Sequence, residues 1–272
     1  MNRTTMLASI FLLAIGAPGQ AQTGSALTEW VNFPVTSVPF GPGERLEYDV
    51  RYGIAGSVGR STLEVVQLDT MRGRPAYHLR FTIKGGILFA KVDDNMQSWL
   101  DATKLVSLRF DQNQKEVNYK RHRIIDFYPS EGVWRRVDEE ETGDLATAEP
   151  LDDISFLYYV RTLPLEVGET YTVPRYWKDE GNPVTVQVLR RERVKLPAGE
   201  FDTIVVRPII KTKGLFSEGG EAEVYFTDDD RRLLVQLKSK VSIGTLDLRL
   251  RGYTPGTLLE PRPAIPAASS RQ

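Results

Sequence analysis

The segment Tyr77-His-Leu-Arg-Phe-Thr-Ile-Lys84 alternates apolar and polar side chains, and this alternation decides the fold class. A period of two places one set of side chains on each face of a β-strand. The same alternation occurs in residues 47–54, 184–188 and 246–250. Short gaps rich in turn residues separate such segments, and they are too short for the helical crossovers of a parallel sheet. The sequence therefore predicts an all-β, mainly antiparallel protein that forms a sandwich or a barrel-like body.

One segment, residues 152–161 (DDISFLYYVR), lacks the alternation. Its acidic start suits a helix N-terminus, where a carboxylate can cap free N–H groups. The side chains that follow are apolar almost all round, which is typical of a buried helix. We expect a single short buried helix near residues 152–161, with Asp152 as its cap and Pro164 beyond its end.

The two halves of the body, about residues 43–150 and 151–253, are similar to each other. At an offset of 127 positions the chain repeats identical or similar residues: Arg80 and Arg207, Trp99 and Phe226, and Asp101 and Asp228. Shared alternation alone also generates such matches. We favour an internal repeat, in which two related sheet halves bury a joint core or enclose a cavity.

The ends of the chain differ in composition from the body. Residues 1–21 have the features of a secretory signal peptide, namely Arg3, an apolar run over residues 7–15 and the small residue Ala21. We expect residues 22–42 to form a linker, residues 43–253 to form one β domain, and the Pro/Ala-rich residues 254–272 to form a disordered tail.

These ends also predict a location. No later run is apolar enough to span a membrane, so we expect a soluble protein with no transmembrane segment after cleavage. No cysteine follows the apolar run, which argues against a lipoprotein. Export of a cysteine-free chain suits the periplasm of a Gram-negative-type bacterium.

The composition excludes several kinds of chemistry. The chain has no cysteine, which removes disulfides, thiolate metal sites and cysteine nucleophiles. It carries 35 basic and 36 acidic residues, a balance that argues against a nucleic-acid partner. It has two histidines and no Gly-x-Ser-x-Gly motif. The pairs Gly85-Gly86 and Gly219-Gly220 lack the context of phosphate loops and are expected at hairpin turns. We therefore expect no cofactor and no metal, and we favour a protein without enzymatic activity over an enzyme.

Four phrases resemble a bacterial exported family: GPGERLEYDV (residues 41–50), DISFLYYVRTLPL (153–165), PAGEFD (197–202), and GEAEVYFTDD (220–229) followed by VQLKSK (235–240). The family is the bacterial domain of unknown function 3108, and the resemblance covers about residues 40–253. It implies an envelope-exported, mostly β domain. It implies no established activity and no catalytic residues.

Aromatic residues provide the first candidate binding site. The candidates spread over both halves are Trp99, Tyr158, Tyr159, Arg161 and Trp177. If the halves splay apart, these side chains line a cleft for an acyl chain or another amphipathic ligand. If the halves pack tightly, the same aromatic residues are core.

Charged residues provide the other candidates. The basic cluster Tyr119, Lys120, Arg121 and Arg123 suits an anionic polymer or a lipid head group, or else forms a solvated strand face. The acidic pairs are Asp93-Asp94, Asp152-Asp153 and residues 228–230. Two carboxylates can hydrolyse a glycoside, but adjacent acids on a strand point to opposite faces, and acids in turns serve the turn.

We therefore expect an exported envelope protein that is not catalytic and that binds a hydrophobic or amphipathic ligand such as a lipid. One alternative is a module that binds an envelope protein or polysaccharide. A second alternative is a carboxylate-based enzyme acting on a glycan.

Overall fold

The computed structural model describes residues 37–87, 90–116, 119–210, 222–240 and 245–259. The predicted signal peptide, most of the predicted linker, most of the predicted tail, and Gly219 and Gly220 lie outside the described residues.

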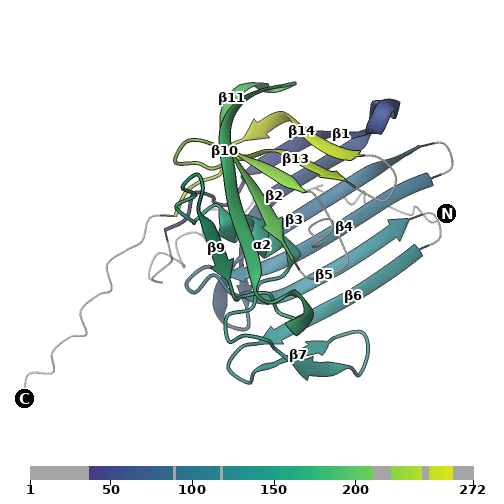
Figure 1. Cartoon of the computed structure of the whole chain (residues 1–272). Coiled ribbons are helices and arrows are strands. Elements are labelled where there is room, and N and C mark those ends of the chain that lie inside the picture. The colour runs from purple at the N-terminus through teal and green to yellow at the C-terminus, as the bar shows by residue number, and fades with distance from the viewer. Residues whose placement is uncertain (1–36, 88–89, 117–118, 211–221, 241–244, 260–272) are drawn as a thin grey trace, which may run out of the picture.

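Within the described residues, fourteen strands form one antiparallel sheet (Figure 1). The first half contributes β1 (Arg45–Tyr52), β2 (Ser57–Met71), β3 (Arg74–Ile87), β4 (Ala90–Asp101), β5 (Ser107–Glu116), β6 (Tyr119–Tyr128), β7 (Val133–Arg136) and β8 (Thr142–Asp144). The second half contributes β9 (Thr170–Val173), β10 (Val184–Leu196), β11 (Gly199–Ile209), β12 (Glu223–Thr227), β13 (Leu234–Lys240) and β14 (Thr245–Thr254). Two short 3₁₀ turns, η2 (Gly53–Ala55) and η3 (Asp179–Gly181), complete the strand connections.

Both halves are meanders, and the first strand of the chain joins them by pairing with the last. The strand order is therefore β8 to β1 followed by β14 to β9. The edge strands β8 and β9 are not paired with each other, so the sheet is not closed. Near this seam, an isolated parallel bridge links Leu151 to Tyr176. The predicted all-β antiparallel fold with a barrel-like body is confirmed, although its two halves are one continuous sheet.

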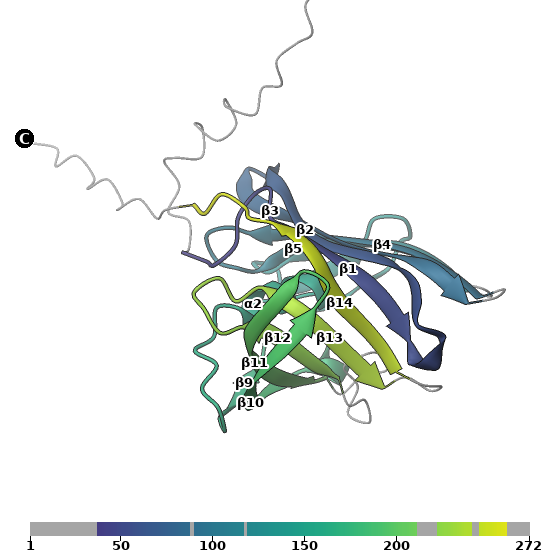
Figure 2. The ribbon, with the colours of Figure 1, turned by 90° about the horizontal axis from the view of Figure 1, so that it is seen from above.

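Among the residues that the structure describes, the sheet folds over one α-helix, α2 (Asp153–Val160), which lies between its two layers (Figure 2). Asp152 caps this helix and accepts hydrogen bonds from the backbone N–H groups of Ile154 and Ser155 at 2.9 and 3.0 Å. Ile154, Phe156, Tyr158 and Val160 are buried in one core together with strands of both halves. The expected buried helix and its cap are confirmed.

The alternation of the sequence assigns two faces to the sheet. We call the face that bears Leu79 and Phe110 the inner face, since these side chains are fully buried against the core. We call the opposite face, which bears Arg80 and Asp111, the outer face. Tyr48, Leu248 and other apolar residues of the predicted alternating segments lie in the core.

Three local predictions require correction. Ile54 continues the alternation in sequence, but the strand ends at Tyr52 and Ile54 is fully exposed in the 3₁₀ turn that follows. Phe40, assigned to the linker, is fully buried in the core, so the folded body begins before residue 43. Gly85 lies within β3 rather than at a hairpin turn. There it faces Gly59 of β2, and a Cβ on Gly85 would lie 2.4 Å from the carbonyl oxygen of Val58.

Corresponding strands of the halves begin at similar spacings. Ser57 and Val184 open β2 and β10, and Ser107 and Leu234 open β5 and β13; both pairs are 127 positions apart. The offset found in the sequence thus also relates strands that hold the same place in each meander. This agreement supports the proposal of an internal repeat.

Candidate functional site

Along strands β3 to β6, the side chains of the inner face change from fully buried to half-buried. One row of side chains near α2 is fully buried: Leu79, Ser98, Phe110 and Ile125. The next row, one step toward the β3–β4 and β5–β6 turns, consists of Phe81, Met96, Gln112 and Arg123, which lie opposite one another in register. In this row Phe81, Met96 and Arg123 are only half-buried. We call it the Arg123 row.

The Arg123 row is amphipathic across the sheet. Its β3 and β4 end, Phe81 and Met96, is apolar, and beyond it the half-buried Ile83 lies opposite the buried Asp94. Its β5 and β6 end is polar, and Gln112 there is 6% exposed. The Nε of Arg123 donates a hydrogen bond to Oε1 of Gln112 at 2.7 Å. An apolar strip that ends in a fixed guanidinium is complementary to an amphipathic molecule.

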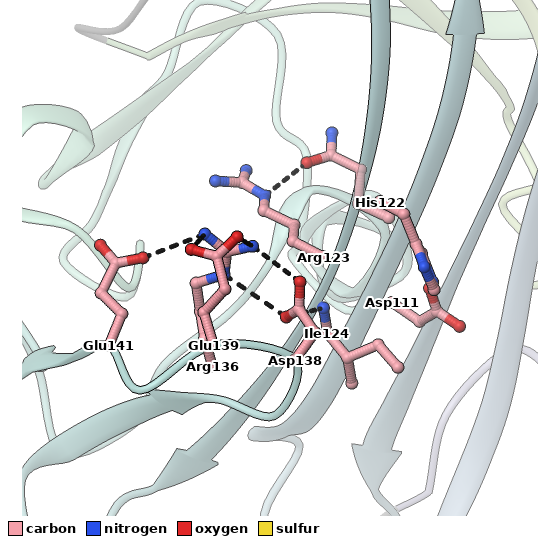
Figure 3. Close-up of polar contacts among 9 residues, drawn as sticks. Asp111, His122, Arg123, Ile124, Arg136, Asp138, Glu139 and Glu141 are labelled. Atoms are coloured by element: carbon pink, nitrogen blue, oxygen red, sulfur yellow. Dashed lines mark hydrogen bonds and ion pairs between the residues drawn. The ribbon is translucent and has the colours of Figure 1, made fainter.

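The basic cluster predicted on one surface is divided between the two faces by β6. Arg121 and Arg123 share the inner face, whereas Lys120 and His122 point to the outer face. Figure 3 shows Arg123 and His122 extending from opposite sides of the strand. His122 contacts Oδ1 of Asp111 at 3.1 Å. The backbone of Tyr119 opens β6.

Arg136 of β7 is the inner-face neighbour of this cluster, and it is already neutralised. Its guanidinium donates hydrogen bonds to Asp138, Glu139 and Glu141 at 2.7 to 3.4 Å (Figure 3). These contacts raise the pKa of Arg136, with the hydrogen bond to Asp138 contributing most. Arg136 therefore forms an internal ion-pair network on the strand beside Arg123.

Lys178, from the connection after β9, brings a third cation to Arg121 and Arg123. Burial lowers the pKa of Lys178, and repulsion by Arg123 and by Arg121 lowers it further. Asp153 lies in the same environment: burial raises the pKa of its carboxyl, and the charges of Arg123 and Lys178 oppose that rise. The hydroxyl of Tyr176 donates to Oδ1 of Asp153 at 3.0 Å. Residues of both halves thus form one positively charged cluster.

The outer face carries a separate hollow of about 360 Å³. It is lined by Arg80, Thr82, Lys84, Asp93, Asn95, Asn113 and Lys115. The short side chains Thr82, Asn95 and Asn113 form its floor, because they lie opposite one another on β3, β4 and β5. Oδ1 of Asn95 is buried and has no hydrogen-bond partner among the described residues.

The five candidate ligand residues do not form one site. Tyr158 and Arg161 pack together in the core, with the guanidinium 5.4 Å from the ring centre. Trp177 is 2% exposed, and its ring lies 5.5 and 5.6 Å from those of Phe127 and Trp134. Tyr159 is half-buried beneath Arg175. Trp99 lies on the outer face and stacks on His78 at 4.6 Å.

Arg161 has a buried counter-charge. Its guanidinium donates to both carboxylate oxygens of Glu44, at 2.5 and 2.9 Å. It also donates to the carbonyl oxygens of Pro39 and Arg231 at 3.0 and 2.9 Å. The two charged side chains are 1% and 0% exposed. This network joins the N-terminal segment, the end of α2 and the β12–β13 turn.

The acidic pairs serve local structure. Asp93 faces outward toward Lys84, whereas its neighbour Asp94 is buried and accepts from the backbone N–H of Lys115 at 2.9 Å. Asp229 accepts from the N–H groups of Arg231 and Arg232, as expected for a turn. Within the described ranges, no group of three or more histidine, aspartate or glutamate side chains is placed to hold a metal ion. Of the helices that the structure describes, none has the length and apolar character that crossing a membrane requires.

The fold and this face define a class: a curved antiparallel β protein that is filled by a helix at one end and amphipathic on its inner face toward the other. The chain belongs to the family described as protein of unknown function (DUF3108), whose family model matches residues 47–251. The predicted family membership is confirmed. Among curated proteins, no sequence matches this chain.

Several solved structures are similar to this chain at low sequence identity. A β-barrel-like protein of the domain of unknown function DUF1849 from Brucella abortus is 11% identical, with a TM-score of 0.50, and the match covers 83% of this chain and 100% of that one. A candidate exported protein with a YmcC-like fold from Bacteroides fragilis is 10% identical, with a TM-score of 0.28 and coverage of 81% and 99%. A lipoprotein candidate from Parabacteroides distasonis is also 10% identical, with a TM-score of 0.34 and coverage of 80% and 99%.

Sequence patterns alone do not mark most of the Arg123 row as a site. Phe81 fits the alternation of its strand, and no local pattern distinguishes Met96 or Gln112. The available signal was the period of two that Arg121 and Arg123 share, which assigns both to one face. No local pattern connects them with Lys178, 55 positions beyond Arg123.

Proposed function

We propose that the protein is exported to the bacterial envelope and binds a hydrophobic or amphipathic ligand on the inner face of β3 to β6. The observation that carries the proposal is the change from the buried row of Leu79 to the half-buried side chains Phe81 and Met96. Partly exposed apolar side chains that adjoin the core are typical of a surface that contacts a ligand. The signal-like N-terminus supports export.

The position of α2 restricts where such a ligand lies. Phe156 and Tyr158 fill the space between the layers at the helix end of the molecule, where they are 1% and 0% exposed. The apolar part of the ligand therefore lies against Phe81, Ile83 and Met96, toward the strand turns.

Native mass spectrometry tests this proposal on mature protein purified from its own envelope without detergent. We expect an additional mass that solvent extracts as lipid. We also expect the purified protein to bind the neutral apolar dye diphenylhexatriene. Met96→Glu places a charge in the apolar strip and should abolish both signals. Asn95→Glu, the adjacent position on the outer face, is the matched control and should retain both. Apo protein that also fails to bind the dye would contradict the proposal.

The outer hollow favours a second function, binding of an acidic envelope polysaccharide. Three cations and one carboxylate line it, and its floor of one hydroxyl and two amides can donate to and accept from sugar hydroxyls. Calorimetry with tetragalacturonate should show binding that weakens at high salt and in Lys115→Gln. Maltotetraose is the uncharged control. Equal binding of both oligosaccharides, or no binding, would contradict this second proposal.

A further inference from the structure

We propose that the ligand of the inner face is an anionic amphiphile, and that Arg123, Arg121 and Lys178 bind its phosphate or carboxylate head group. The inference rests on the proposed function, since it concerns the polar end of the same ligand. The geometry places the charge at one end only: the Arg123 row begins with the apolar Phe81 on β3 and ends with a guanidinium on β6.

The two arginines are placed to act together. Arg121 and Arg123 project from the same face of β6, roughly 7 Å apart along the strand. Guanidinium groups bind carboxylate and phosphate oxygens through paired N–H donors. Gln112, which is 6% exposed, holds the Nε of Arg123 at 2.7 Å and fixes the direction of its side chain. The site is thus oriented by a buried partner on the neighbouring strand.

Lys178 completes the cluster from the other half of the molecule. Its ammonium lies 4.5 Å from the centre of the Trp177 ring, in the connection that follows β9. Burial disfavours its charged form most, and the charges of Arg123 and Arg121 disfavour it further. A bound anion relieves this repulsion, because it is attracted to all three cations at once.

Two carboxylates lie close to the cluster. Asp153 accepts the hydroxyl of Tyr176, and Glu180 also interacts with Lys178. Arg136, on the adjoining strand, is surrounded by the carboxylates of Asp138, Glu139 and Glu141 (Figure 3). The Nε of Arg123 donates to the amide oxygen of Gln112. The sheet therefore places an arginine held by its own carboxylates on β7, beside the two arginines that share the inner face of β6.

Displacement of diphenylhexatriene from the full chain tests the inference with three amphiphiles of one chain length. Dodecyl phosphate, dodecanoate and dodecanol are titrated below their micelle-forming concentrations. We expect the two anions to displace the dye at concentrations at least roughly tenfold lower than dodecanol, because a single charge-assisted contact is worth about that factor. Inorganic phosphate at the same concentrations should displace no dye, because it lacks the apolar chain.

Three variants test which residues produce the preference for the anions. Arg123→Gln and Lys178→Gln should each remove most of the preference for the anions and leave displacement by dodecanol unchanged. Lys120→Gln removes the same charge from the outer face of β6 and should change nothing. Equal displacement by all three amphiphiles would overturn this inference and leave the proposed function intact. An unchanged preference in both inner-face variants would also overturn it. Failure of the dye to bind at all would instead contradict the proposed function.

Discussion

A carboxyl group without a counter-charge lies at the start of α2. Asp152 is fully buried, and its hydrogen-bond donors are neutral: the hydroxyl of Ser98 at 2.6 Å and the backbone N–H groups of Ile154 and Ser155. Burial raises the pKa of Asp152 from 3.8 to about 6, against these hydrogen bonds. The helix cap is thus retained at an electrostatic cost whenever the carboxyl is ionised.

This cost predicts an unusual pH dependence. Because the folded-state pKa lies above the unfolded value, the native protein binds more protons between pH 4 and 6, and the free energy of unfolding falls as pH rises through that window. Asp152 alone contributes a decrease of roughly 3 kcal/mol at most. Asp152→Asn keeps a capping side chain without the charge. We expect it to match the wild type near pH 4 and to exceed it by roughly 1–3 kcal/mol above pH 7.

Urea unfolding of both proteins at pH 4, 5, 6 and 7.5 measures this difference. Other acids, such as Glu223, whose pKa is lowered to about 2 mainly by its hydrogen bond to Arg190, titrate in both proteins and cancel in the comparison. A difference between the two proteins that stays constant across these pH values would contradict the prediction.

At the scale of elements, one ion pair connects segments that are far apart in sequence. Arg161 at the end of α2 binds Glu44 before β1 and the carbonyl oxygens of Pro39 and Arg231. Although burial opposes the charged form, the charge and hydrogen bonds of Glu44 raise the pKa of Arg161. Removal of one partner leaves an uncompensated buried charge.

Arg161→Met should therefore reduce the free energy of unfolding by about 3–5 kcal/mol. The double variant Glu44→Gln with Arg161→Met should lose less than the sum of the single variants, because it leaves no isolated charge. Arg193→Met removes an exposed arginine that pairs with Glu200, and should cost less than about 1 kcal/mol. Chemical denaturation measures the wild type and the four variants Arg161→Met, Glu44→Gln, the double variant and Arg193→Met. If Arg161→Met lowers the free energy of unfolding by no more than Arg193→Met does, the buried pair does not hold these elements together.

The sequence predicted several of the secondary-structure elements, but not all of their limits and contacts. Period-two alternation predicted the strands and the apolar face of β3, whereas the lack of alternation and the acidic start of residues 152–161 predicted the buried helix. All of these follow from local side-chain pattern. It overextended β1 to Ile54, because alternation does not mark the residue at which pairing ends. The basic run at Arg121 to Arg123 was assigned to one surface although alternate residues of a strand must face opposite ways. The contribution of Lys178 depends on how the halves fold over each other, which no local pattern contains.

At the scale of the whole molecule, the sheet contains one pairing between the ends of the chain. Strand β1 pairs with β14, and Arg45 lies opposite Thr254. The adjoining segments also meet: the N–H of Thr257 donates to the carbonyl oxygen of Pro42 at 2.9 Å. Each half has an edge that only the other half covers, and both share one core. The sequence did not predict this junction, because strand order is a long-range property.

The junction predicts that a circular permutant folds to the same structure. A short Gly/Ser linker from residue 259 to residue 37 is compatible with the adjoining backbones, and new ends between Ala148 and Glu149 fall at exposed residues. The strands would then run from β9 to β14 and on from β1 to β8, so all fourteen would pair in the order of the chain.

Because the most non-local pairing becomes a hairpin, we expect faster folding, by roughly an order of magnitude, with stability within about 2 kcal/mol. Stopped-flow refolding and circular dichroism measure both. If the halves are copies of one unit, exchanging their order also leaves the pattern of the sheet unchanged. A permutant that fails to fold would instead show that continuity of the chain into α2 is required before the halves can pair.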